Sequence, residues 1–138
     1  MTAPLPPAAA WQVLLDRHAE LFADLDEGAR IGVARRDDVN QAGAVMVVWE
    51  IEDGKAKAKE QPFPGYQEAK VDVMLVGDDG AMGDIAGELD GDALPALKQL
   101  VRKGSFICYV LKRRCVLEAA GYEDVLDSFG VPFLGACR

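Results

Sequence analysis

The dipeptide Asp53-Gly54 constrains the fold more than any other feature, because it predicts a two-residue type I′ hairpin turn. Folding the chain back about this turn places two opposite-charge pairs on one face: Glu52 with Lys55, and Glu50 with Lys57. The same register pairs a large residue with a small one on the other face: Ile51 with Ala56, and Trp49 with Ala58. A slip of one residue would destroy both patterns, so the sequence predicts this register as well as the turn.

Helical and strand-like segments follow each other in blocks along the rest of the chain. Apolar residues at helical spacing predict an amphipathic helix over 8–26, and further helices are predicted over 93–103, 112–120 and 122–129. Strand-like runs occupy 30–37, 44–52 and 70–76, with a short returning strand after Asp78-Asp79-Gly80. The run 105–111 favours a buried strand that contains Cys108, and one continuous helix over 105–120 is the alternative. The order predicts a single α+β domain over 1–138, with a mostly antiparallel sheet of four to five strands and C-terminal helices. The Pro-rich segment 1–7 is expected to be frayed, and 131–138 to be extended.

Composition limits the classes of function. The chain has 138 residues and a formal net charge of −8, which disfavours nucleic-acid binding because the phosphate backbone repels an acidic protein. No apolar run approaches the roughly 20 residues that span a bilayer, and the N-terminus lacks the pattern of a signal peptide. Three cysteines without metal-like spacing argue against a secreted disulfide scaffold. We therefore expect a cytoplasmic protein, and the Ala-, Gly-, Val-, Asp- and Arg-rich composition suggests a bacterial source.

Cys115 directly follows the cations Lys112, Arg113 and Arg114. If a helix begins near residue 112, its N-terminus and these cations would stabilise a thiolate, and an anionic ligand could bind beside them. His18, the only histidine, falls on the apolar side of the first predicted helix and is the one available imidazole base. The simpler interpretation makes Cys115 an inert residue beside solvated charges and His18 a packed side chain.

Two further groups of residues are candidates for binding. Phe63 and Tyr66 lie in a Pro- and Gly-containing loop, where they could contact a partner or pack onto the sheet. Ala56 and Ala58 could leave a pocket beneath Trp49, between sheet and helices. Met46 and Val48 face away from Trp49, so both faces of their strand need covering, and a homodimer would cover the second face.

The sequence contains no recognisable catalytic or metal-binding signature. The acids between Asp78 and Asp92 do not have the spacing of a calcium loop, and no zinc, dinucleotide or Ser-His-Asp pattern is present, so no cofactor is expected. The sequence favours a non-enzymatic module that binds a protein partner, such as an adaptor or a chaperone-like protein. The alternative is a small-ligand-binding domain or a thiol-dependent enzyme with a pocket between sheet and helices.

Overall fold

The computed structural model describes residues 4–41 and 43–131. Its helices are α1 (Ala8–Arg17), α2 (Ala19–Phe22), the 3-10 turn η1 (Arg36–Asp38), α3 (Asp79–Ala86), α4 (Ala93–Lys103), α5 (Arg114–Ala119) and α6 (Glu123–Ser128). Its strands are β1 (Arg30–Arg35), β2 (Val45–Glu52), β3 (Lys55–Pro62), β4 (Val73–Gly77) and β5 (Phe106–Val110). Of the tail predicted over 131–138, residues 132–138, which include Cys137, lie outside the described residues.

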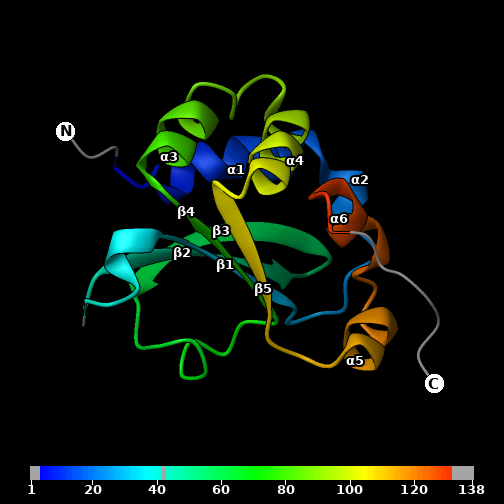
Figure 1. The fold of residues 1–138 in the computed structure, drawn as a ribbon. Helices are drawn as coiled ribbons and strands as arrows, with labels where there is room; N and C mark the ends of the chain where they lie inside the picture. Colours follow the sequence, from blue (N-terminus) through cyan, green and yellow to red (C-terminus); the bar gives the residue numbers. More distant parts are fainter. Residues whose placement is uncertain (1–3, 42, 132–138) are drawn as a thin grey trace.

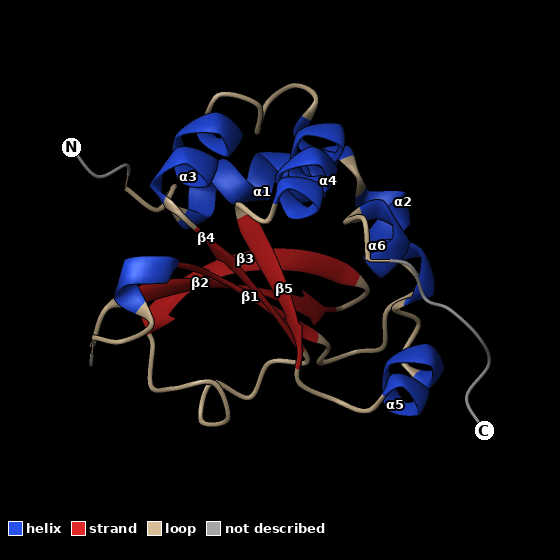
Figure 2. Cartoon of the chain, viewed as in Figure 1, coloured by secondary structure: helices blue, strands red, loops and turns tan. Residues whose placement is uncertain are grey.

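The five strands form one mixed sheet in the order β3-β2-β1-β4-β5, as Figure 2 shows. Every neighbouring pair is antiparallel except β1 and β4, which are parallel. The long loop after β3 returns the chain to the end of the sheet at which β1 begins, so β4 runs in the same direction as β1. Helices α1, α3 and α4 lie over one face of the sheet in Figure 1, and this loop crosses below the other face. The fold is therefore α+β with a mostly antiparallel sheet, as the sequence predicts.

The predicted hairpin is confirmed in turn and register. Asp53 and Gly54 both have positive φ, 54° and 76°, and the four predicted cross-strand pairs are those observed. The ion pairs, however, do not run directly across the ladder: Lys57 contacts Glu52 and Lys59 contacts Glu50 on the diagonal, and Lys59 also reaches Glu52. The twist of a two-stranded ribbon brings diagonal neighbours within reach of long side chains, so charge pairs need not form directly across the ladder.

Two predicted segments differ from the structure. The first helix is broken at His18, whose φ of −116° and ψ of 33° are not helical, so α1 and α2 replace one helix over 8–26. Asp78 does not start a returning strand; its side chain accepts a hydrogen bond from the backbone N–H of Ala81 at 2.8 Å and caps α3. The N-cap favours a helix here in spite of the three glycines near it.

The second face of the sheet is covered by the chain itself. Phe63, Ala69 and Val71, from the loop between β3 and β4, pack on Met46 and Val48 in a small apolar cluster. The homodimer was predicted to cover these same side chains, so this reason for expecting a second copy is removed. The larger cluster lies on the helix side of the sheet and contains the aromatic core of the protein.

The two edges of the sheet differ in how their backbone groups are protected. On β3, the side-chain amide of Gln12 donates to the carbonyl of Ala56 at 3.0 Å and accepts from the N–H of Ala58 at 2.8 Å. Lys55, Lys57 and Lys59 line the same strand with charge. Charged side chains and covered backbone groups are the usual means of preventing edge-to-edge association. Strand β5, at the opposite edge, has neither protection within the described part of the chain.

Candidate partner-binding surface

The backbone of β5 offers three residues for pairing with another strand. The N–H of Asp78 donates to Ser105 at 2.9 Å, and the N–H of Leu111 donates to Asp72 at 3.0 Å. Successive residues of a strand point their backbone N–H and C=O groups to opposite sides. These two bonds therefore identify which residues of β5 direct these groups toward β4 and which direct them away from it. The residues whose N–H and C=O groups point away from β4 are therefore Phe106, Cys108 and Val110. None of them has a hydrogen-bond partner beyond the strand among the described residues.

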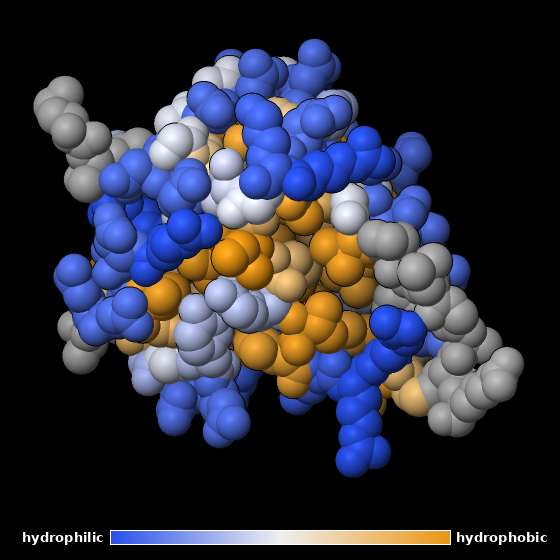
Figure 3. All heavy atoms as spheres, in the orientation of Figure 1, coloured by the Kyte–Doolittle hydropathy of each residue, from blue (hydrophilic) through white to orange (hydrophobic). Residues whose placement is uncertain are grey.

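The side chains around this edge are apolar and accessible. Ile107, Tyr109 and Val110 are 36%, 39% and 45% exposed, and Val116 of α5 is 50% exposed. Figure 3 shows an apolar patch on the face of the molecule where Figure 1 draws β5, with strongly hydrophilic residues around its border. An accessible apolar patch of this kind, on a strand with unpaired backbone groups, is the feature expected of a docking site.

Tyr66 and Lys112, both candidates from the sequence, meet at the C-terminal end of β5. The Tyr66 ring lies 5.4 Å from that of Tyr109, measured between centroids. Tyr66 and Lys112 also line one depression of about 500 Å³, together with Lys70, Gln67, Val71 and Leu111. Partial burial, followed by the neighbouring Tyr109, raises the pKa of Tyr66 above its ordinary value, so its hydroxyl stays protonated and able to donate. Lys112, Arg113 and Arg114 are all exposed.

Trp49 and Phe63 lie in the two apolar clusters rather than at a surface. Trp49 is 1% exposed and packs against the rings of Trp11, Phe22 and Phe129, with centroids 5.5 to 6.1 Å away. Trp49 is therefore part of the aromatic core on the helix side of the sheet. Phe63 is 4% exposed and stacks edge-on with Tyr66 at 5.5 Å. Of the two loop aromatics, only Tyr66 is accessible to a partner.

The thiols do not form a catalytic pair with His18. Cys115 lies in the first turn of α5, as predicted, but it is disulfide-bonded, and a sulfur in that state is not a nucleophilic thiolate. Its activation after reduction stays a prediction. Cys108 is the free cysteine of the described residues, and burial raises the pKa of its thiol to about 12, so it is protonated and unreactive at neutral pH.

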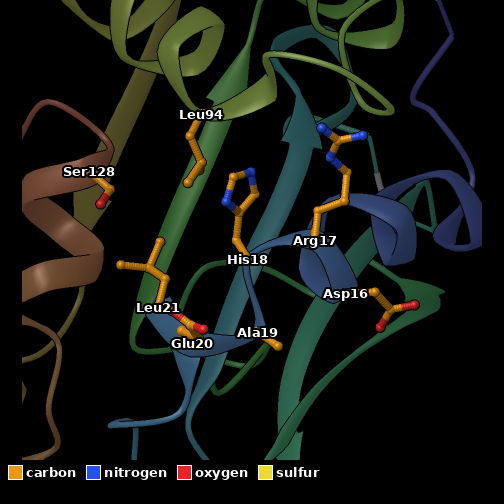
Figure 4. A pocket seen from close by; sticks show the side chains of 8 residues that line it. All are labelled: Asp16, Arg17, His18, Ala19, Glu20, Leu21, Leu94 and Ser128. Atoms are coloured by element: carbon orange, nitrogen blue, oxygen red, sulfur yellow. The ribbon is translucent and has the colours of Figure 1, made fainter.

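His18 lines a separate depression of about 610 Å³ at the junction of α1 and α2. In Figure 4 its ring lies between Leu94 and Arg17, with Ser128 of α6 beyond Leu94. Its Nε2 atom is buried and lacks a hydrogen-bond partner in the described part of the protein. No residue of α5 lines this depression, so His18 and Cys115 belong to different places in the fold.

The sequence patterns did not indicate that β5 is the most accessible part of this surface. Of the two alternatives for 105–111, the favoured strand is the one observed. Cys108 was expected in a buried strand, whereas β5 lies at the sheet edge with Ile107, Tyr109 and Val110 accessible. Cations on both sides of the run were a signal that it reaches solvent. Among the described residues there is no group of three metal-ligating side chains and no helix long and apolar enough to cross a membrane.

Comparisons with known proteins leave the family open. No family model and no curated protein sequence matches the chain. A conserved hypothetical protein of Thermus thermophilus, described as possibly a sterol carrier protein, aligns over 94% of this chain and 87% of its own, with 17% identity and a TM-score of 0.46. A structure of sterol carrier protein 2 covers 94% and 95%, with 19% identity and a TM-score of 0.46. Sterol carrier protein-2 like-3 of Aedes aegypti covers 83% and 92%, with 18% identity and a TM-score of 0.35. Superpositions this loose establish neither a family nor a ligand.

Proposed function

We propose that this protein is a non-enzymatic binding module that takes up an extended segment of a protein partner as a sixth strand beside β5. The observation that carries the proposal is the contrast between the two sheet edges: Gln12 and three lysines protect β3, whereas β5 presents apolar side chains and unpaired backbone groups. Strand addition uses such an edge, since main-chain hydrogen bonds supply affinity and alternate side chains supply specificity.

The surface has room for the side chains of an added strand. Ile107 and Tyr109 point to the sheet face opposite the helices, two residues apart, and Tyr66 extends that face beyond the strand. Alternate side chains of an added strand would contact this row. The other side chains would lie beside Val110 and Cys108 on the helix side.

The test removes one outward N–H without touching the ladder between β4 and β5. Val110→Pro deletes a donor that points away from β4, and proline is tolerated at an edge position of this kind. Val110→Thr is the matched control, because it keeps the branched shape and the N–H. Random peptides displayed on phage would be selected against the immobilised wild-type protein, and the best binders would be synthesised.

We expect the selected peptides to slow amide hydrogen exchange at Phe106, Cys108 and Val110, the three outward positions. Binding should be lost in Val110→Pro and kept in Val110→Thr. Peptides that bind both variants equally and leave exchange in β5 unchanged would refute strand addition. Failure to select any binding peptide would count against the proposal as well.

A second candidate function is small-molecule binding at the depression beside His18, which the buried, unpaired Nε2 atom favours. The test is to titrate small carboxylic acids, acetate and benzoate, while following the imidazole resonances of His18 by NMR. Saturable shifts that His18→Phe abolishes would support this function. Unchanged resonances would remove it for this class of ligand.

A further inference from the structure

Six cations of this acidic protein lie at the two ends of β5. Arg102 and Lys103 end the helix that precedes the strand, and Lys112 and Arg113 follow it; all four are exposed. Arg36 joins the first end, where its guanidinium donates to the carbonyl of Gly104 at 3.4 Å. Lys70 joins the second end, in the depression that it shares with Lys112.

These six side chains make no ion pair with a described carboxylate, whereas Arg30, Arg35, Lys57 and Lys59 each do. Arg17, Lys55 and Lys98 make none either, but in a chain of net charge −8 the six form a basic group at each end of the accessible strand. Charge arranged in this way on a surface favours a partner of the opposite sign. Lys103 also lines a depression with Asp84, Glu88 and Asp92, so the second end is the more strongly basic of the two.

A second copy of the chain fits this edge poorly. Antiparallel pairing of two β5 strands would bring the basic end at Arg102 and Lys103 of one copy beside the basic end at Lys112 and Arg113 of the other, and symmetry would repeat this at the second end. Like charges placed opposite one another destabilise a strand pair. The same arrangement is complementary to a segment with acidic ends.

We infer, on the basis of the proposed function, that the occupant of this edge is an extended protein segment with alternating apolar residues at its centre and Asp or Glu at both ends. The strand covers five residues, about 17 Å at about 3.4 Å per residue, so the two acidic positions should be about six residues apart. The basic depression at Tyr66, Lys70 and Lys112 receives one acidic end, with the Tyr66 hydroxyl as an additional donor.

The experiment compares three synthetic peptides that share the centre Val-Thr-Val-Thr-Val and carry two Glu, two Gln or two Lys at each end. Binding to the full chain is followed by fluorescence anisotropy at about 0.05 M and about 0.5 M salt, where screening differs strongly. We expect the Glu peptide to bind at least about tenfold tighter than the Gln peptide at low salt, with the difference shrinking at high salt. The net charge of −8 by itself would favour the Lys peptide, so this order of affinities identifies a local effect.

Lys112→Glu and Lys55→Glu form a matched pair, because they change the net charge equally at opposite edges of the sheet. Lys112→Glu should reduce the preference for the Glu peptide, because only the other end of β5 stays basic, and Lys55→Glu should leave the preference intact. Equal binding of all three peptides, still lost in Val110→Pro, would overturn the charge inference and leave strand addition standing.

Two other outcomes would also overturn it. Absence of binding by every peptide would reject both the charge inference and the proposed function. A dimer in analytical ultracentrifugation that Val110→Pro dissociates would identify a second copy as the occupant.

Discussion

Gly121 and Gly104 provide a matched pair that separates backbone conformation from packing. Both follow a helix in the left-handed region, with φ of 88° and 81°. In both cases the next residue donates a backbone hydrogen bond five residues back, Tyr122 to Leu117 and Ser105 to Leu100. They differ in their surroundings: a Cβ at Gly104 would meet nothing within 4 Å, whereas a Cβ at Gly121 would overlap the carbonyl oxygen of Asp24 and lie 2.8 Å from its carbonyl carbon.

The two alanine substitutions should therefore differ in cost. A left-handed alanine costs about 1–2 kcal/mol, partly offset by the lower entropy of the unfolded chain, so Gly104→Ala should lose about 1 kcal/mol. Gly121→Ala has the same conformational cost and must also displace backbone that is held by the bond from Asp26 N–H to Ala120 at 3.0 Å. Overpacking of this kind adds about 1–3 kcal/mol, for a total of about 2–4 kcal/mol.

Urea denaturation of both variants, followed by the fluorescence of the buried Trp11 and Trp49, measures the two free energies of unfolding. We expect Gly121→Ala to be the less stable variant by at least about 1 kcal/mol. Equal losses would refute the reasoning, because they would mean that the segment around Asp24 moves aside freely. In that case α5 would not be fixed against this segment by close contact.

Three further predictions concern buried polar groups. Tyr122→Phe removes a 2.7 Å hydrogen bond from a buried hydroxyl to the Asp72 carboxylate and should lower the free energy of unfolding in urea by about 1.5–3 kcal/mol; no loss would mean that the bond is dispensable. Gln12→Ala unpairs two backbone groups of β3 and should cost about 1–2 kcal/mol in the same assay, and an unchanged midpoint would contradict the protective role of Gln12. Burial raises the pKa of the Cys108 thiol from 9.0 to about 12, so the unfolded chain binds fewer protons between these values and stability must fall as pH rises through this window. Wild-type protein should lose more stability than Cys108→Ala between about pH 8 and about pH 10.5, and parallel losses would show that the thiol is not shifted.

Local pattern was sufficient to predict several parts of the fold. The hairpin followed from Asp53-Gly54 because only a few turn types connect two strands through two residues, and each turn type fixes the register of the strands. The helix over 93–103 followed from its local start and stop residues, among them Gly104, whose left-handed conformation ends it. The break at His18 and the helix after Asp78 were missed, because tertiary packing and a single capping bond decided them.

The candidate site was predictable only in fragments. Tyr66 and Lys112 were both expected to bind a partner, but they are 46 positions apart in the sequence, and nothing local indicates that they line one depression. Trp49 and Phe63 carried the same aromatic signal as Tyr66, and they are buried because the helices cover one face of the sheet and the loop before β4 covers the other.

The sequence by itself determined most of the strands and helices, the register of the hairpin and the acidic net charge, because these depend on neighbouring residues and on composition. Only the tertiary structure decided that β5 is an edge strand. The place of a strand in the sheet depends on how the chain connects the strands, here through α3 and α4 from β4 to β5, and not on the residues of the strand itself. The same apolar run would be core at the centre of the sheet. At the edge, between two groups of cations, it becomes the surface at which we propose that a partner binds.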